Sequence, residues 1–423
     1  MTRGAEGRIR RDLWILFGAL FLFHAAAGVA SPLLPRLRHA LHASYSQIGW
    51  VNAAFGVSRL LMAVPAGWLL RRRHPTVLVF LGMGIVACGN LLAASAGTVY
   101  GVIAGRAIAG FGYSPAVVGT LTLLAGSATQ ASRARIFSLY EFLIVAGLAA
   151  STALTGFVGE WMGWRAGFVL GAVLAGLGLG AAVLALGPGM LVGSLPGASR
   201  PQRPLRRVRS TAWVEVWPVG MVLLASFVLS YAWTGHFYTL YPLYGGEQLG
   251  LSTEVVGVAM STGYLADLAL LFPYGWLADR HGRVPVLFAG VLLVALAAFT
   301  LPLISSGPGY LAIGVLTGVG FACWGLPPAL LTDWVPSGSQ GMVLGFYRFM
   351  IDLGFILGPW TASLALEAGG FRIAAWMVAG LTGASLFAFF GLRVHPPSAV
   401  EVDPNERLPW EQQGCSRVFG LGE

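Results

Sequence analysis

Hydrophobic residues follow one another in long runs along most of the chain, and short stretches with Arg, Gly, Pro or Ser separate these runs. The runs are continuously apolar and do not alternate with polar residues, which is typical of membrane-spanning helices and not of barrel strands. A helix needs about 20 such residues to cross roughly 30 Å of hydrocarbon. We therefore expect an all-α integral membrane protein. The twelve predicted transmembrane helices, called spans 1 to 12, are residues 13–35, 46–70, 76–96, 99–125, 135–159, 164–187, 213–242, 252–278, 284–304, 308–334, 341–365 and 372–393.

The composition excludes a water-soluble protein. Of the 423 residues, 56% are hydrophobic and only 10% are charged, whereas a soluble domain carries about 25% charged residues. The N-terminal segment has the residue order of a signal peptide, but its apolar run is too long and eleven more spans follow, so we interpret it as span 1. The three cysteines, Cys88, Cys323 and Cys415, are too few and too scattered for a disulfide framework or a metal site.

The distribution of arginine predicts which side of the membrane each loop faces. With the N-terminus inside, 19 of the 26 basic residues fall in inner segments, and only Arg36, Arg38, Arg165 and Arg372 fall in outer loops. The positive-inside rule then places both termini in the cytoplasm. We expect a multi-pass protein of the inner (plasma) membrane. Its net charge of +9 is then explained by basic residues near anionic headgroups and does not indicate binding of nucleic acid.

The chain repeats itself with an offset of about 207 residues. YEFLIVAG from Tyr140 matches YRFMIDLG from Tyr347, and PAGWLLRRRHP from Pro65 matches PYGWLADRHGR from Pro273. Such self-similarity indicates a duplicated unit. Further equivalent positions are Gly110 and Gly318, Gly112 and Gly320, Glu160 and Glu367, Gly163 and Gly370, and Arg165 and Arg372.

The duplication predicts the domain organisation. We expect an N-terminal six-helix bundle at residues 1–187 and a C-terminal six-helix bundle at 213–393, in parallel orientation. The Arg-rich stretch 188–212 is interpreted as a cytoplasmic linker on the lipid headgroups. The tail, 394–423, contains Pro and acidic residues and is predicted to be disordered.

Three short motifs carry a resemblance to a known family. They are GWLADRHGR from Gly275, RAIAGFG from Arg106, in which Ala109 replaces the usual Gln, and GWRAGF from Gly163. Together with the duplicated twelve-helix layout, they resemble the major facilitator superfamily over essentially the whole chain. The resemblance implies a secondary transporter whose two bundles rock about a central site. It further implies that spans 1, 4, 7 and 10 line a cavity, and that span 2 meets span 11 and span 5 meets span 8.

The same resemblance implies a latch on the inner side. Asp279 is expected under the N-terminus of span 5, where the helix dipole favours a carboxylate, and Arg283 is expected to pair with Asp333. The first half has Arg71 and Ala125 at the corresponding positions, so we expect one inner latch instead of two. The alternative is that these are solvated loop charges, since exposed ion pairs contribute little.

Charged residues inside the predicted spans are candidates for function, because each costs about 2.5 to 3.5 kcal/mol at the centre of a helix. At 1.5 Å per residue, Arg59, Asp267 and Asp352 each lie about 16 Å from the inner end, close to the middle of the membrane, whereas Glu141 and Arg348 lie at about 10 Å. Because spans 2 and 11 are expected to meet, we predict an ion pair between Arg59 and Asp352, either as a gate or as a static packing contact. The full set, Arg59, Arg106, Glu141, Asp267, Arg348 and Asp352, has three charges of each sign and is expected to neutralise itself.

Two carboxyl groups are candidates for proton transfer. Asp267 and Glu141 lie on spans 8 and 5, which should meet, with no arginine between them at their own depths. Burial and a nearby like charge both favour the protonated form, so one of the two is the candidate proton carrier. Asp352 is assigned to the same proton-coupling set, and Arg348 is assigned to the gate.

The candidate substrate-binding residues are mostly on the helices that should line the cavity. Arg106 is expected either to bind an anion, to tune a carboxylate or only to pack. The histidines are expected either to bind solute or to bond a neighbouring helix. The aromatic residues are expected either to form flat walls for an apolar substrate or to pack in the core. The full set is His24, Asn52, Arg59, Arg106, Trp233, His236, Tyr238, Trp324 and Trp360.

These features predict a transporter of a small organic solute that works by alternating access and is coupled to protons. Efflux is favoured, with uptake of an organic anion as the alternative. A membrane-embedded enzyme would need clustered catalytic groups, but the seven histidines are dispersed. A channel does not account for opposite charges at the contact between the halves. The expected partners are the substrate, protons and the lipid bilayer, and we expect a monomer without cofactor, metal or nucleic acid.

Overall fold

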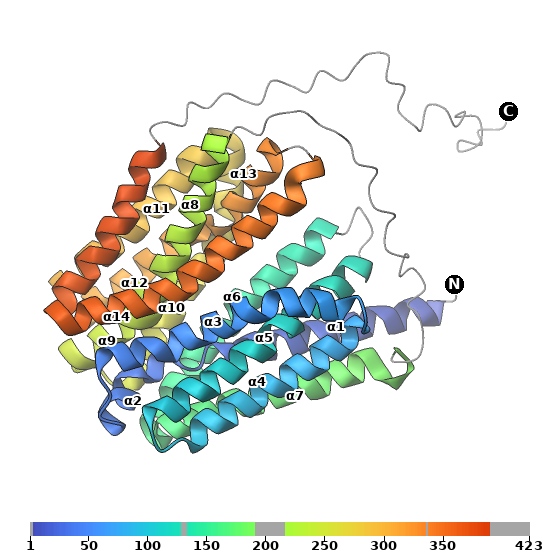
Figure 1. Ribbon diagram of the computed structural model, residues 1–423, viewed down its shortest axis with the longest axis horizontal. Coiled ribbons are helices and arrows are strands. Elements are labelled where there is room, and N and C mark those ends of the chain that lie inside the picture. Colours follow the sequence, from blue (N-terminus) through green and yellow to red (C-terminus); the bar gives the residue numbers. More distant parts are fainter. Residues whose placement is uncertain (1–2, 128–132, 191–215, 336, 390–423) are drawn as a thin grey trace, which may run out of the picture.

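The computed structural model describes residues 3–127, 133–190, 216–335 and 337–389, and in these ranges the regular structure is entirely helical (Figure 1). Of the predicted linker, only 188–190 at the end of a helix is described, and the predicted tail lies outside the described residues. The first group of helices is α1 (Arg3–Ala27), η1 (Ser31–Leu33), α2 (Leu34–Ala40), α3 (Tyr45–Leu70), α4 (Pro75–Ser95), α5 (Val99–Ser127), α6 (Arg133–Met162) and α7 (Trp164–Met190).

The second group follows the undescribed segment 191–215. It consists of α8 (Val216–Ala232), η2 (Trp233–Leu240), α9 (Tyr241–Leu243), η3 (Tyr244–Gln248), α10 (Thr253–His281), α11 (Arg283–Thr300), η4 (Leu301–Leu303), α12 (Gly307–Phe321), η5 (Ala322–Gly325), α13 (Leu326–Trp334) and α14 (Ser337–Phe389).

Eleven segments of the described chain are long and apolar enough to cross a bilayer. The last of them runs for 49 residues, from Ser339 to Phe387, and the backbone at Gly370 inside it is not helical. A single helix of that length would extend roughly 70 Å, more than twice the thickness of the hydrocarbon layer. The segment is therefore two spans joined at Gly370, and the described residues contain the twelve membrane helices that the sequence predicts.

The duplication is visible at the helix break in each half. Gly163 (φ 86°) separates α6 from α7, and its repeat partner Gly370 (φ 75°) divides α14. Glycine adopts a positive φ readily because it has no β-carbon. The same residue at the same place in the repeat thus ends the fifth span of each half and starts the sixth.

The duplication is equally visible in helix packing. A β-carbon on Gly110 of α5 would collide with the carbonyl oxygen of Phe55 in α3, and one on Gly318 of α12 would collide with that of Gly263 in α10. Small residues allow helix backbones to approach this closely in membranes. Spans 4 and 10 therefore contact spans 2 and 8 in the same way, as expected for two copies of one unit.

The two groups of helices meet at one end and diverge toward the other. In Figure 1 the first group, blue to green, touches the second near α2 and α9, and the groups separate toward the ends where α1 begins and α14 stops. We call the end of contact the outer face and the opposite end the inner face. The contacts between groups are mainly those of α3 with α14 and of α6 with α10, the pairs that the family resemblance implies.

Burial along the contacting helices follows the same pattern. On α3, the residues from Ile48 to Arg59 are almost all buried, whereas Val64, further toward the inner face, is 80% exposed. On α14, Met342 is 64% exposed near the inner face, whereas Asp352 is buried. The two helices therefore pack together over their outer halves and separate beyond the middle of the membrane.

Candidate functional site

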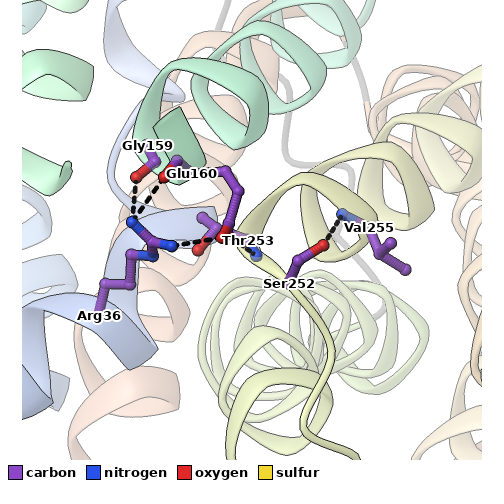
Figure 2. A network of polar contacts seen from close by, with 6 residues as sticks. All are labelled: Arg36, Gly159, Glu160, Ser252, Thr253 and Val255. Carbon is purple, nitrogen blue, oxygen red and sulfur yellow. Dashed lines mark hydrogen bonds and ion pairs between the residues drawn. The ribbon is translucent and has the colours of Figure 1, made fainter. Parts of the chain in front are cut away.

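A polar network on the outer face joins helices of both groups. Figure 2 shows Arg36 of α2 directed at the last turns of α6, where its Nη1 donates to the carbonyl oxygens of Gly159 (2.8 Å) and Glu160 (2.9 Å). Its Nη2 lies 2.5 Å from Oε1 of Glu160. The other carboxylate oxygen of Glu160 accepts a hydrogen bond of 2.7 Å from the backbone N–H of Thr253, the first residue of α10. Glu160 thus caps a helix of the other group at its N-terminus, where the helix dipole favours negative charge.

The repeat produces the same contact on the other side of the molecule. Glu367 of α14, the partner of Glu160 in the repeat, accepts a hydrogen bond of 2.8 Å from the backbone N–H of Ser46 in the first turn of α3. The two capped helices are also N-capped by their own serines, Ser44 and Ser252. Each half therefore supplies a carboxylate to the second span of the other half. We call the Glu160–Thr253 and Glu367–Ser46 contacts the outer caps.

A third contact closes the outer face near the start of α3. Glu247 of η3 accepts a hydrogen bond from the Tyr45 hydroxyl (2.5 Å) and pairs with Arg38 (3.3 Å). The guanidinium of Arg38 lies 3.9 Å from the centroid of the Tyr45 ring. The sequence interpretation did not identify these outer residues, although the matched positions of Glu160 and Glu367 in the repeat were a signal for the caps.

Asn52 links α3 to the seventh span. Its Nδ2 donates to the carbonyl oxygen of Tyr238 (3.3 Å) and contacts Oγ1 of Thr239 (3.5 Å). Both partners lie in η2, a π-helical segment inside the span. π-Helical turns are rare and often occur at functional sites. The contact brings one predicted site residue, Asn52, against the backbone of another, Tyr238.

The ion pair predicted from helix depth is present. Arg59 of α3 pairs through Nη2 with Oδ1 of Asp352 in α14, and both side chains are buried. The Arg59 guanidinium lies 4.0 Å from the centroid of the Phe355 ring. Arg348, one turn before Asp352, approaches its other carboxylate oxygen at 3.5 Å. One aspartate therefore joins two arginines at the point where the two groups of helices begin to separate.

Asp267 of α10 has a different environment. It is 5% exposed, and within the described ranges it has neither a hydrogen bond nor an ion pair. It interacts electrostatically with Glu141 of α6, which is exposed and interacts in turn with Arg348. The two candidate proton carriers thus lie near each other, and no described cation pairs with Asp267.

Arg106 of α5 is a buried cation, in contrast to Asp352, which is paired, and to Asp267, which has no ion pair among the described residues. It is 3% exposed, and no described carboxylate lies within ion-pair distance of it. Its Nη1 lies 3.5 Å from the carbonyl oxygen of Ala27, and its guanidinium lies 4.6 Å from the centroid of the Phe55 ring. The expectation that the six charges neutralise one another is therefore wrong in detail, because two arginines share Asp352, while Arg106 and Asp267 have no ion-pair partner in the part of the chain that the structure describes.

Three of the four predicted aromatic residues come together. Trp233 of η2 lies 5.9 Å from Tyr238 and 5.7 Å from Trp324 of η5, measured between ring centroids, and 4.6 Å from Phe321. We call these four residues the aromatic cluster. Trp360 lies elsewhere, 6.2 Å from Trp50 in the outer contact of α3 with α14, so it does not belong to this wall.

The two histidines lie in the packed interior and not on an open cavity. Nδ1 of His24 is 3.2 Å from the Tyr113 hydroxyl of α5, and Nε2 of His236 is 3.2 Å from Oγ1 of Thr317 in α12. Both imidazoles are almost completely buried. Each histidine therefore bonds a neighbouring helix, which is the alternative role that the sequence left open. Neither histidine lines an open cavity of the described structure in this conformation.

On the inner face, Arg283 pairs with Asp333 as expected, but Asp279 is exposed and has no contact of hydrogen-bond or ion-pair type with another described residue. Residues 128–132, just before α6, lie outside the described ranges. Between the described parts of the two groups, all hydrogen bonds and ion pairs lie on the outer face or near the middle of the membrane. The inner latch is thus not engaged in this conformation.

Comparison with known proteins agrees with this architecture. A family model described as Major Facilitator Superfamily matches residues 16–262 and 222–420. Multidrug resistance protein 1 of Bacillus subtilis is 19% identical over 351 residues, which cover 82% of this chain and 87% of the relative. Quinolone resistance protein NorA of Staphylococcus aureus is 20% identical over 366 residues, which cover 85% of this chain and 91% of the relative.

Solved structures share the fold at lower identity. The crystal structure of a POT family transporter in complex with a thioalcohol conjugated peptide superimposes with a TM-score of 0.74 at 13% identity. The superposition covers 90% of this chain and 95% of that transporter. The match therefore extends over both groups of helices.

Proposed function

Because the chain belongs to the Major Facilitator Superfamily, we propose that it exports a small organic solute by proton-coupled alternating access. As a member of this family it is a multi-pass membrane protein and a secondary transporter, not an enzyme. The names of two relatives, a multidrug resistance protein and a quinolone resistance protein, support export as the direction. The Arg-rich inner face is proposed to lie in the cytoplasm, at the plasma membrane.

The observation that carries the proposal is the position of the contacts between the two groups. They lie on the outer face and near the middle of the membrane, which is the arrangement of a transporter whose binding site opens to the inner side. To open outward, the protein must break the outer caps and form contacts on the inner face. We propose that Asp279 then moves under the N-terminus of α6 and holds the inner face closed.

The two buried aspartates are proposed to have different roles. Asp352 holds Arg59 and Arg348, so it keeps the groups together at the hinge and breaks its contact with Arg59 when the groups rock. Asp267 has no cation beside it among the described residues, and an unpaired carboxylate inside a membrane protein is costly. Asp267 therefore carries the coupled proton, and Glu141, which is near it and exposed, exchanges that proton with the inner side.

The test is proton flux in liposomes that hold the purified protein and a trapped pH-sensitive dye. A solute that binds should drive proton movement across the membrane, and Asp267→Asn should abolish this movement while still allowing exchange of solute down its own gradient. Glu254→Gln, in the first turn of the same helix and outside the proposed relay, is the control and should behave like the unmodified protein. Full proton coupling in Asp267→Asn would exclude the proposed carrier.

A second candidate function is uptake of an organic anion. One observation supports its anionic substrate, namely the buried guanidinium of Arg106, which has no carboxylate partner among the residues that the structure describes. This observation does not set the direction of transport. Transport of labelled solute into liposomes and out of them, with the pH gradient imposed in each direction, separates uptake from export.

A further inference from the structure

Arg106 is a buried cation whose polar contacts are incomplete. The side chain is 3% exposed, its Nη1 makes one long contact of 3.5 Å with the Ala27 carbonyl oxygen, and its Nε has no hydrogen-bond partner. Burial of a charge without a partner is costly, so proteins rarely retain it without a reason. A group outside the described chain that completes these contacts would remove the cost.

Arg59 provides a comparison inside the same protein. Arg59 and Arg106 are both buried, and each guanidinium lies over a phenylalanine ring, Phe355 for Arg59 at 4.0 Å and Phe55 for Arg106 at 4.6 Å. Arg59 also holds the carboxylate of Asp352, whereas Arg106 lies over the ring with no carboxylate from the described ranges beside it. Stacking uses the face of a guanidinium and leaves its N–H edge available for a planar acceptor such as a carboxylate.

The surroundings of Arg106 disfavour a cationic ligand and provide an apolar surface. Neither α3 nor α5, the two helices that hold Arg106 and the ring beneath it, contains an Asp or Glu. The Tyr238 side chain is close enough to interact electrostatically with both Arg106 and Arg59. Tyr238 also packs against Trp233, so the aromatic cluster begins next to the unpaired guanidinium.

We propose that Arg106 binds the acidic group of the transported solute, which is an organic anion with an aromatic or apolar body. The carboxylate, or an acid of similar shape, accepts hydrogen bonds from the free N–H groups of Arg106, and the body lies against Tyr238 and Trp233. This inference rests on the proposed transport function and adds the chemical class of its substrate. It applies equally to export and to uptake.

Arg106 should affect the stability of the ligand-free protein. A binding residue held ready for a ligand reduces stability, so its removal stabilises the protein at the expense of function. Arg106→Met should therefore raise the melting temperature of the purified, ligand-free protein by roughly 2 to 4 °C. Arg59→Met should lower it, because Asp352 loses one of its two arginines. If Arg106→Met lowers the melting temperature as Arg59→Met does, Arg106 is a packing residue and the proposal is wrong.

Binding is tested with matched triplets of probes that share one body and differ in charge. The first triplet is 1-naphthoate, 1-naphthylmethylammonium and 1-naphthalenemethanol, and the second is indole-3-acetate, tryptamine and indole-3-ethanol. The anions should protect the protein against thermal unfolding, and Arg106→Met should weaken this binding at least tenfold. Protection by the ammonium members, or anion protection that survives Arg106→Met, would overturn the proposal. Equal protection by chloride alone would also overturn the proposal, because the site would then bind inorganic anions and not an organic acid.

Two further variants separate binding from folding. Arg106→Lys keeps the charge but loses the planar fork, so it should bind the anions several-fold more weakly even if Arg106→Met fails to fold. Arg165→Met is the matched control, because Arg165 also bonds a carbonyl oxygen, that of Ala96, and lies over a tryptophan ring, but is exposed. It should leave anion binding unchanged. These measurements use no proton gradient, so failure of anion binding and failure of proton coupling are told apart.

Discussion

At the scale of single residues, two buried aspartates show how one type of side chain takes different roles. Asp352 and Asp267 were both expected near the middle of the membrane. Asp352 accepts contacts from Arg59 and Arg348, whereas Asp267 has no ion pair within the described part of the chain. We therefore propose that the first carboxyl group holds the two groups of helices together, and that the second can change its protonation without breaking an ion pair with a described residue.

This difference predicts opposite responses to the same substitution. Asp352→Asn leaves Arg59 buried without an anion and should cost about 3 to 5 kcal/mol, the usual effect of breaking a buried ion pair. Asp267→Asn removes no contact and should change stability by less than about 1 kcal/mol. Thermal unfolding followed by tryptophan fluorescence compares the two variants directly. A loss in Asp267→Asn as large as that in Asp352→Asn would mean that Asp267 has a structural partner and cannot be the proton carrier.

The sequence predicts some of these residues better than others, for a physical reason. The pair of Arg59 with Asp352 follows from depth along each helix and from which spans meet, and both can be read from residue numbers. The direction in which a side chain points around its helix is harder to read. His236 lies inside the π-helical segment η2, whose turns hold more residues than those of an α-helix, and its imidazole packs in the interior against Thr317.

At the scale of elements, the ends of the helices are the best predicted feature of this protein. The thickness of the bilayer sets their length and charged or small residues end them, so the observed bounds differ from the predicted ones by only a few residues for most spans. The outer caps could not be predicted in the same way, because they depend on how a short loop presents a helix N-terminus to the other half. Only the equivalence of Glu160 with Glu367 in the repeat pointed to them.

The outer caps predict a graded effect on the opening of the outer face. A carboxylate at a helix N-terminus contributes about 0.3 to 1 kcal/mol, so Glu160→Gln or Glu367→Gln should each favour the outward-open state by about twofold to fivefold. The two single effects should be similar in size, because the Arg36 that pairs with Glu160 lies in the same group of helices and does not join the two groups. Because the two caps are separate contacts, the double variant should approach the product of the single effects.

Distances between spin labels across the outer face measure this equilibrium. Two labels on the first group alone provide the control, because their separation should stay constant in all variants. An unchanged distribution across the outer face in the double variant would show that the caps do not hold the outer face closed.

At the scale of the whole molecule, the chain must be compatible with more than one arrangement of its two groups. Their inner ends diverge in Figure 1, while the polar contacts between their described parts are near the outer face and the middle of the membrane. The pattern of hydrophobic residues fixes twelve helices and a repeat but is the same in every conformation, so the sequence does not show which face is closed.

The closed outer face depends on a close contact of two glycines, and this contact can be blocked. Gly257 of α10 and Gly156 of α6 face each other, and a β-carbon on Gly257 would collide with the carbonyl oxygen of Thr152. Gly257→Leu should leave each group of helices folded, because the side chain points at the other group, but should prevent the outer ends from meeting. The protein should then be held open to the outside and lose transport, while the melting temperature stays within a few degrees of the unmodified protein.

The matched control for Gly257→Leu is Gly176→Leu on α7, where nothing lies within 4 Å of an added β-carbon. It should transport normally and close its outer face. A cysteine placed at Ser363 reports the state, because Ser363 of α14 is buried against Gly49 of α3 and its thiol should react with a membrane-impermeant maleimide from outside only when these two helices separate. Fast labelling in Gly257→Leu and slow labelling in Gly176→Leu would establish that the two groups close about this contact. Normal transport by Gly257→Leu would mean that α6 and α10 stay together throughout the cycle, and that the groups do not rock as rigid units.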